Sequence, residues 1–272
     1  MSETRLGRFG ALALTLLLSA CASVQTTQSG LVGVNRTQYM SSMVSEAQLD
    51  QEAAAQYKQI LSEARTKGLL DRDAAQTQRV QAIARRLIAQ VGVFRPDARS
   101  WQWEQHVLSS DEVNAWCMPG GKIAVYTGLL QKIKPTDAEL AAVMGHEIAH
   151  ALREHAREQV SQQMVTSVGI SILAAVTGSQ ASADLGSKLS QVMFTLPNSR
   201  EHETEADRLG VELAARAGYD PRAAVTLWQK MGQVGGGSPP RVSLYPPLCG
   251  EPDCRFAAGL GSSHAFVYTG HR

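Results

Sequence analysis

The chain has 272 residues, of which 44% are hydrophobic and 19% charged, and its formal net charge is +1. This ordinary composition argues against wholesale disorder and against a protein built of many membrane spans. The near-zero charge offers no electrostatic reason to expect a nucleic-acid partner, and an aromatic content of 6% leaves little material for stacking platforms. We therefore expect one or two globular domains and no nucleic acid.

The first twenty residues have the pattern of an export signal. Arg5 and Arg8 precede an uncharged run, 10–20, which is shorter than the roughly 20 apolar residues that span a bilayer. The run ends in the letters LSAC at 18–21, which resemble a bacterial lipobox, where the Cys thiol takes a diacylglycerol before cleavage. An ordinary signal peptide with a chance Cys is the alternative. We predict that Cys21 is the lipid-modified mature N-terminus.

This signal also predicts a location and a redox environment. Ala22 follows the Cys, and by resemblance to lipoprotein sorting rules it favours the outer membrane, so we expect a lipid anchor on the periplasmic face of the outer membrane. In such an oxidising compartment Cys249 and Cys254 could close a small disulfide loop. Cys117 is then expected to be a buried free thiol.

Regular elements are predicted after a polar segment. Residues 22–45 are rich in Ser, Thr, Gln and Gly without lasting periodicity and are predicted to be a tether. Apolar residues at helical spacing predict helices over 46–66 and 73–91. Alternating or β-rich segments predict strands over 101–108 and 122–127.

Further helices are predicted in the second half. One begins after Thr136 as N-cap and is expected to continue to about Gln159. The uncharged segment 164–178 reads as a buried core helix, with a flap or membrane-dipping segment as the alternative. Two more helices are predicted over 199–217 and 221–231, followed by little regular structure.

Residues 146–150 have the sequence HEIAH, which is the most specific functional motif of the chain. On a helix of about 3.6 residues per turn, His146 and His150 lie one above the other, so both imidazoles can reach a single metal ion. Glu147 is rotated by about 100° from His146. That position lies beside the ion, where a general base for an attacking water belongs.

A catalytic zinc ion also needs a third protein ligand. The metzincin pattern would place Gly three and His six residues after His150, but the chain has Arg153 and Ala156 there, which excludes that class. His155 is one residue out of phase and is expected to support a ligand or to lie at the surface. The remaining solution is a carboxylate from a second helix.

An acidic cluster at 200–207 offers that carboxylate. Glu203 and Asp207 are four residues apart and share one helix face. Glu203 could bind the metal while Asp207 accepts the second N–H of a ligand histidine. A solvated charged face is the alternative, and it is the commoner reading of such a run taken alone.

Three separated motifs together resemble one family. The HEIAH segment at 146–150, paired with the RxxExxAD pattern at 200–207, is similar to the gluzincin metallopeptidases that include HtpX, BepA and the CAAX prenyl proteases. Residues 114–121 (NAWCMPGG) and 125–130 (VYTGLL) resemble the segment before their zinc helix. The resemblance covers about residues 45–232.

The resemblance implies an α+β fold, a mainly helical gluzincin-like domain with a small antiparallel or mixed sheet whose edge strand faces the active-site cleft. It implies one zinc ion per chain. The implied ligands are His146, His150 and Glu203, the base is Glu147, and Asp207 and Arg200 would support the ligands. The strand after the Gly120–Gly121 turn is expected to be the edge on which a substrate peptide lies, through Gly121, Lys122, Ile123, Ala124 and Val125.

Four segments are therefore predicted: a lipoprotein signal peptide at 1–20, a tether at 21–45, a zinc metallopeptidase domain at 46–232 and an irregular tail at 233–272. The tail departs from the family, whose relatives commonly continue into a Ser/Thr-His-Pro segment. His264 is a weak substitute for that histidine.

The predicted function is a lipid-anchored periplasmic zinc endopeptidase in quality control. Its partners would be polypeptides, either unfolded or envelope proteins, and the membrane that holds its anchor. The alternative is a periplasmic chaperone or assembly factor for outer-membrane proteins with a latent zinc site. The unusual tail and the apolar segment 164–178 motivate this alternative.

Overall fold

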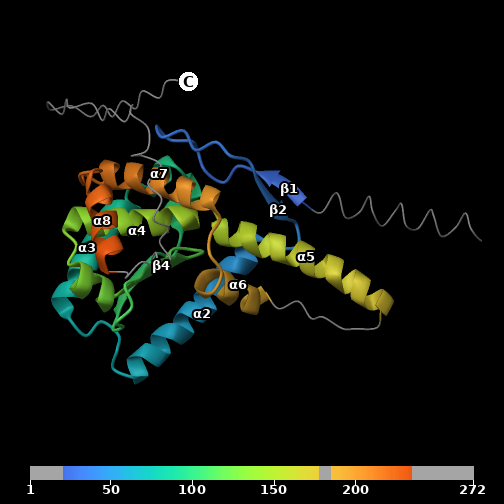
Figure 1. Ribbon diagram of the computed structural model, residues 1–272, viewed down its shortest axis with the longest axis horizontal. Coiled ribbons are helices and arrows are strands. Elements are labelled where there is room, and N and C mark those ends of the chain that lie inside the picture. Colours follow the sequence, from blue (N-terminus) through green and yellow to red (C-terminus); the bar gives the residue numbers. More distant parts are fainter. Residues whose placement is uncertain (1–20, 178–184, 235–272) are drawn as a thin grey trace, which may run out of the picture.

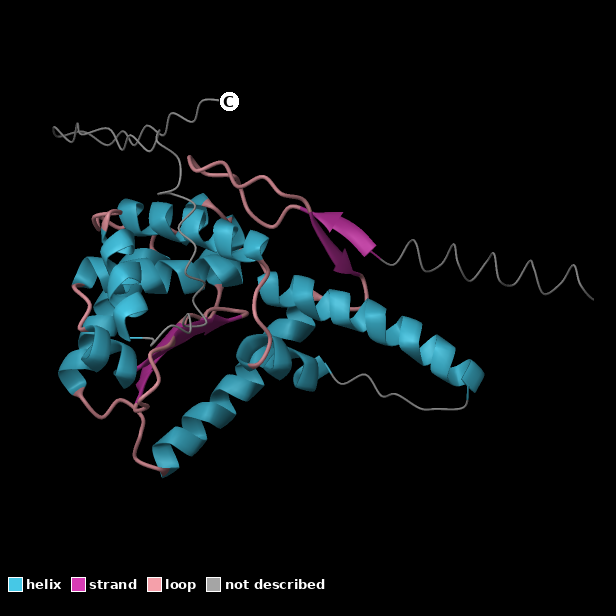
Figure 2. Ribbon diagram, viewed as in Figure 1, coloured by secondary structure: helices cyan, strands magenta, loops and turns pink. Residues whose placement is uncertain are grey.

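The computed structural model describes residues 21–177 and 185–234. A three-stranded sheet lies between helix α4 on one side and helices α2 and α6 on the other, and a two-stranded ribbon lies apart from it (Figures 1 and 2). The predicted α+β architecture, mainly helical with a small mixed sheet, is confirmed.

The elements have the following bounds. The helices are α2 (Glu46–Thr66), α3 (Ala74–Ile88), α4 (Asp137–Leu152), α5 (His155–Thr177), α6 (Leu185–Phe194), α7 (Arg200–Arg216) and α8 (Ala223–Val234). The strands are β1 (Cys21–Val24), β2 (Gln38–Ser41), β3 (Glu104–Leu108), β4 (Ala115–Met118) and β5 (Lys122–Tyr126). Short helical turns lie at Val91–Val93, Pro96–Ser100 and Leu129–Ile133.

The strand order of the central sheet is β3-β5-β4. β5 is parallel to β3 and antiparallel to β4, so both of its edges are paired. The prediction that residues 121–125 form the free edge is therefore wrong. Gly120 and Gly121, both at positive φ, turn the chain from β4 directly into β5, and β3 then pairs with the far side of β5. Within the described residues, β4 is the edge strand on the α4 side.

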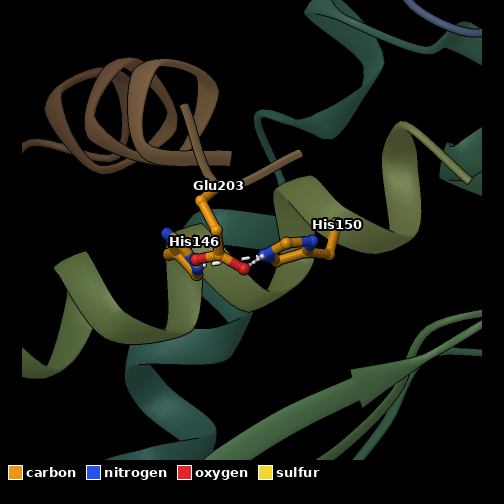
Figure 3. Close-up of side chains that lie close together, drawn as sticks. All are labelled: His146, His150 and Glu203. Carbon is orange, nitrogen blue, oxygen red and sulfur yellow. Dashed lines mark hydrogen bonds and ion pairs between the residues drawn. The ribbon is translucent and has the colours of Figure 1, made fainter. Parts of the chain in front are cut away.

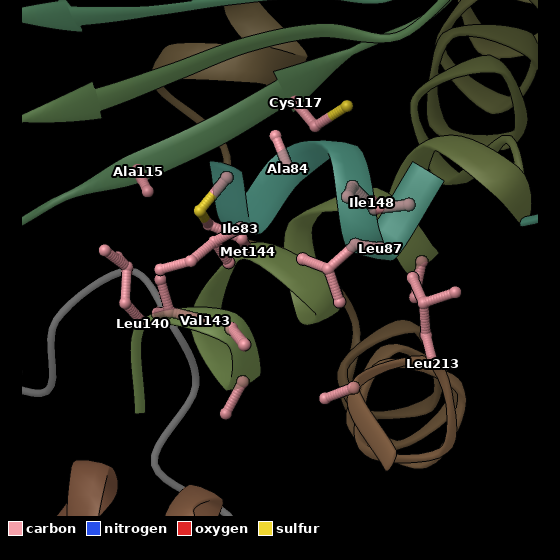
Figure 4. Packing of buried hydrophobic residues seen from close by; sticks show 14 of the residues in the cluster. Ile83, Ala84, Leu87, Ala115, Cys117, Leu140, Val143, Met144, Ile148 and Leu213 are labelled. Atoms are coloured by element: carbon pink, nitrogen blue, oxygen red, sulfur yellow. The ribbon is translucent and has the colours of Figure 1, made fainter. Parts of the chain in front are cut away.

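Both faces of this sheet are buried. Side chains of Ala115 and Cys117 pack with α3 and α4 in the larger core (Figure 4), which also includes Ile123. Trp116 and Met118 face the opposite way, into the core under α2 and α6. Because successive side chains of a strand point to opposite faces, β4 contributes to both cores. Cys117 is a buried free thiol, as predicted.

Side chains cap the N-termini of four main helices, and of these caps Thr136 was predicted. Ser45, Asp73 and Ser199 each accept a hydrogen bond from a backbone N–H in the first turn of α2, α3 and α7. Thr136 and Glu139 form a reciprocal capping box at the start of α4. The predictions of helices in these four places are confirmed, apart from one boundary.

That boundary is the end of α4, which stops at Leu152 instead of continuing to about Gln159. Glu154 has a φ of 52°, in the left-handed region, and α5 begins at the next residue. The carboxylate of Glu154 pairs with Arg95 at 2.7 Å and with Arg157 at 2.7 Å, which holds the break in place. α5 therefore leaves α4 in a new direction (Figure 1).

The predicted tether is instead packed on the domain, and we call residues 21–45 the N-terminal strap. β1 and β2 pair antiparallel within it. The backbone N–H groups of Leu31 and Val32 donate to Glu212 at 2.9 and 3.0 Å, and the N–H of Gln28 donates to the carbonyl of Phe94 at 2.7 Å. The strap also buries Val34, Met40 and Val44, but these apolar residues follow no regular period, so hydrophobic periodicity does not reveal it.

Other differences are smaller. β4 and α6 were not predicted, and α8 begins at Ala223 rather than at Pro221. The predicted signal peptide, 1–20, and the tail from 235, with its candidate disulfide and His264, lie outside the described residues. Across the described part of the chain, every helix is too short or too polar to cross a lipid bilayer.

Candidate active site

The site lies where α4 crosses α7, at two glycines. A Cβ atom on Gly210 would lie 2.6 Å from the backbone N of His146, and one on Gly145 would lie 2.7 Å from the carbonyl oxygen of Gly210. Only residues without a Cβ allow the two backbones to approach so closely. α7 therefore lies along α4 (Figure 1). This close approach lets the carboxylates of Glu203 and Asp207 reach His146.

Two imidazoles and one carboxylate converge there (Figure 3). The Nε2 atoms of His146 and His150 are 3.0 Å apart. Glu203 lies 3.4 Å from the first of them through Oε2 and 3.6 Å from the second through Oε1. The three side chains are buried, and one donor atom from each lies within 4.8 Å of the others. The structure thus brings together the three residues that the sequence indicates as ligands.

The chemistry of this donor set fits a zinc ion. Tetrahedral zinc with bonds of about 2.1 Å separates its ligand atoms by roughly 3.4 Å, close to the spacing seen here. Both Nδ1 atoms are engaged elsewhere, since His146 Nδ1 is 2.8 Å from Asp207 Oδ1 and His150 Nδ1 is 2.8 Å from His155 Nδ1. When the Nδ1 atoms carry the protons, two Nε2 lone pairs and a carboxylate face one point, which favours a cation there.

The site also shifts the pKa values of its groups. Burial lowers the pKa of His146, but hydrogen bonds to Asp207 and Glu203 outweigh it and raise the pKa to about 10. Burial and the neighbouring imidazoles hold the pKa of His150 well below its usual value. Burial raises the pKa of Glu147 to about 7. A cation that binds here therefore competes with a proton for His146.

A cavity of about 240 Å³ opens beside this cluster. Glu147 lines it together with His146 and His150. Ala115 and Cys117 of β4 form part of another wall. The base that the sequence predicts thus faces a space next to the imidazole pair.

In the part of the chain that the structure describes, no strand pairs with the side of β4 away from β5, and the backbone presents hydrogen-bonding groups there. The N–H of Tyr126 donates to the carbonyl of Asn114 at 3.0 Å, which identifies the β4 residues turned toward β5. Because the direction of backbone groups alternates along a strand, the N–H and C=O of Ala115 and Cys117 point away from β5. Residues 121–125 cannot fill this role, since β5 is paired on both sides.

A buried polar network behind the site was missed by sequence reasoning. His155 contacts His150 and lies 3.0 Å from Glu205 through its Nε2. Arg153, which is 0% exposed, also pairs with Glu205 at 3.0 Å. His155 was expected to support a ligand or to lie at the surface, and the structure buries it against His150. A helix continuing through Glu154 would have pointed it elsewhere, so no sequence pattern could show this contact.

The two residues expected to support the ligands are placed differently. Asp207 is buried and contacts His146. Arg200 is exposed at the first position of α7.

Comparisons with known proteins agree with this geometry. Residues 74–269 match the model of Peptidase family M48. The chain is 43% identical over 134 residues to the mitochondrial metalloendopeptidase OMA1 of Arabidopsis thaliana, covering 49% of this chain and 27% of that protein. It is 37% identical over 187 residues to the protein of the same name from Schizosaccharomyces pombe, covering 66% and 52%. It is 30% identical over 195 residues to the beta-barrel assembly-enhancing protease of Escherichia coli, covering 66% and 37%. The chain thus spans about half or less of the length of these relatives.

The comparisons overturn the predicted location. The relatives with the higher identities, from plant, yeast and vertebrate sources, are named as mitochondrial metalloendopeptidases. The prediction of a site on the periplasmic face of the outer membrane is therefore wrong. Its basis was the leader that ends in LSAC and the residue Ala22 after it, and such a short targeting pattern does not by itself identify the compartment.

Proposed function

The chain belongs to peptidase family M48, and we propose that it is a zinc-dependent endopeptidase whose active site is formed by His146, His150, Glu203 and Glu147. The observation that carries this proposal is the convergence of two imidazoles and a carboxylate within 4.8 Å. Glu147 lines the cavity beside His146 and His150, which is where a general base must lie. A purely structural zinc site would instead be closed and usually rich in Cys.

His146, His150 and Glu203 would hold one zinc ion per chain. When bound, zinc supplies a Lewis acid that polarises a peptide carbonyl and lowers the pKa of a water molecule to about 7. Asp207 accepts the Nδ1–H of His146 and so keeps the other ring nitrogen free to bind metal.

Glu147 performs the proton transfers. Its carboxylate takes a proton from the water that attacks the peptide carbonyl and then delivers this proton to the amine that leaves. A scissile bond held in the cavity would lie next to this carboxylate, because Glu147 lines the cavity.

The substrates we propose are polypeptides in extended, unfolded segments. The outward N–H and C=O groups of Ala115 and Cys117 can pair with a peptide backbone, as in the addition of a strand to a sheet edge. Main-chain hydrogen bonds form in the same way for nearly every residue type, so this mode of binding supports broad specificity. Such specificity suits the quality control of misfolded proteins.

Lipid attachment at Cys21 is a separate proposal, which rests on the LSAC pattern at 18–21. The acyl chains would hold the peptidase domain, 46–232, and its strap on a membrane surface. Chains made in cells should begin at residue 21 and carry the added mass of the lipid, and Cys21→Ser should abolish that mass. An intact mass that includes residues 1–20, or that lacks the lipid, contradicts the proposal.

Removal of the metal should abolish peptidase activity. The purified chain is expected to contain about one zinc ion, measured by elemental analysis, and to cleave casein as an unfolded substrate. A chelator should stop the cleavage, and added zinc should restore it. Glu203→Gln should lose both zinc and activity, because it removes the only anionic ligand of the cluster.

Glu201→Gln is the matched control, since Glu201 lies on the same turn of α7 but is exposed. It should retain zinc and activity. Cleavage that continues in a zinc-free chain would contradict the proposed function.

A further inference from the structure

The two histidines of the cluster are held in different ways. His146 Nδ1 contacts a carboxylate directly, that of Asp207, at 2.8 Å. His150 Nδ1 contacts another imidazole nitrogen, Nδ1 of His155, at 2.8 Å. The second nitrogen of His155 is 3.0 Å from Glu205 Oε2. A chain of contacts thus runs from the Glu205 carboxylate through His155 to His150.

We propose that His155 and Glu205 are positioning residues that set the tautomer and the ring orientation of His150. This inference rests on the proposed function, in which His150 binds the metal through Nε2. It adds to that function the residues that make this nitrogen available.

The positions of the ring protons on His155 and His150 follow from the carboxylate of Glu205, which ends the chain of contacts. An ionised carboxylate only accepts hydrogen bonds, so the N–H of a neutral His155 must lie on Nε2, facing Glu205. Nδ1 of His155 then has a lone pair and accepts. The hydrogen bond between the two Nδ1 atoms therefore needs its proton on His150 Nδ1, which leaves His150 Nε2 as a lone pair toward the cluster.

Two arginines pair with the carboxylate of Glu205. Arg36 Nε lies 2.8 Å from its Oε1, and Arg153 Nε lies 3.0 Å from its Oε2. Both guanidinium groups stay protonated at all ordinary pH values. The carboxylate is thus a fixed acceptor at the end of the chain of contacts.

The plane of the His155 ring is fixed from its other side. His202 stacks on it with 4.2 Å between ring centroids and 11° between ring planes. His202 in turn lies 3.1 Å from Glu158 Oε2, and Glu158 also pairs with Arg36 at 2.7 Å. Arg36 belongs to the N-terminal strap, so the strap takes part in holding the groups behind His150.

Nitrogen chemical shifts of the imidazoles test the tautomers directly. In the metal-free full chain we expect the Nδ1–H form for His150 and the Nε2–H form for His155, resolved by NMR with His-labelled protein. An Nδ1–H form of His155 would overturn the proposal. This measurement needs neither zinc nor activity, so it is independent of the proposed peptidase function.

Zinc affinity tests the consequence for the metal site. His155→Phe preserves a ring that can stack on His202 but removes the acceptor for His150. It should weaken zinc binding by about 10–100-fold, measured by competition with a chromophoric chelator. His155→Asn should recover much of the affinity, because its side-chain oxygen can accept from His150 Nδ1–H near the place of the lost ring nitrogen.

His202→Phe is the matched control, since it changes a buried imidazole of the same network while its ring can still stack on His155. It should lower the melting temperature of the metal-free chain without lowering zinc affinity. Equal zinc affinities in wild type and His155→Phe would overturn the proposal, as would equal losses in His155→Phe and His202→Phe. A wild-type chain that binds no zinc would overturn the proposed function. The tautomers of His150 and His155 would still decide whether His155 and Glu205 position the His150 ring.

Discussion

Glu147→Gln is expected to lower kcat/KM for peptide cleavage by about 10²–10⁴-fold, the usual contribution of a general base, while zinc remains bound. The amide has nearly the shape of the carboxylate, but it cannot take a proton from water and pass it on. Glu147 is not among the three converging donors, so its replacement leaves the metal site intact. Metal analysis and casein cleavage on the same preparation measure both results.

Glu63→Gln controls for the loss of a glutamate as such, since Glu63 is exposed on α2 and away from the cavity. Cleavage by this variant should equal that of wild type. If Glu147→Gln cleaves as fast as wild type, Glu147 is not the base. If Glu147→Gln also replaces the wild-type gene in cells, an assembly or chaperone role with a latent site accounts for the cellular function.

The inactive Glu147→Gln chain also allows the substrate edge to be tested, because bound peptide is not consumed. Hydrogen exchange at the backbone amides of Ala115 and Cys117 should slow when an unfolded peptide binds. Exchange at Ile123 and Val125, on the central strand β5, should change little. Unchanged exchange at Ala115 and Cys117 would show that peptides bind elsewhere.

Gly210→Ala is expected to disrupt the metal site, although Gly210 is not one of its proposed ligands. The new methyl group would lie 2.6 Å from the backbone N of His146. Backbone atoms cannot turn aside as a side chain does, so α7 must move away from α4 and carry Glu203 and Asp207 with it. Overpacking of this kind costs about 1–3 kcal/mol of stability. We expect a lower melting temperature and weaker zinc binding.

Gly232→Ala provides the matched control. Gly232 lies on α8, and among the described residues outside its own turn of helix no atom lies within 4 Å of the position of its added Cβ. The same substitution should leave zinc binding unchanged and stabilise the chain by up to about 1 kcal/mol, because Ala favours a helix more than Gly. A Gly210→Ala chain that melts and binds zinc like wild type would show that the close approach of α4 and α7 does not hold the site together.

The local features of the fold could be predicted from the chain itself. Helical spacing and the cap Thr136 predicted helices near four of the places where the structure has them, and the structure adds the caps Ser45, Asp73 and Ser199. These signals act over one or two turns of chain, and that is the range at which sequence patterns are read. The spacing of His146 and His150 belongs to the same class, because one helix alone brings the two rings together.

Contacts between distant segments could not be predicted in this way. The residues of β4 and β5 are similarly apolar, and only the pairing of β3 with β5 decides which strand is the edge. A polar strap reads as a tether until Arg36, Leu31 and Val32 meet their partners on α5 and α7. The left-handed backbone at Glu154 likewise depends on Arg95, 59 residues earlier.

By itself, then, the amino-acid order determined the helices, the HEIAH pair and a carboxylate-bearing helix that could complete a metal site, since each depends on neighbours along the chain. Tertiary structure alone decided that Gly145 and Gly210 bring those helices into contact, that β4 offers the open edge, and that His155 turns back to His150. The physical reason is that these outcomes depend on close packing and on hydrogen bonds between groups far apart in sequence, which become defined only when the whole domain closes around them.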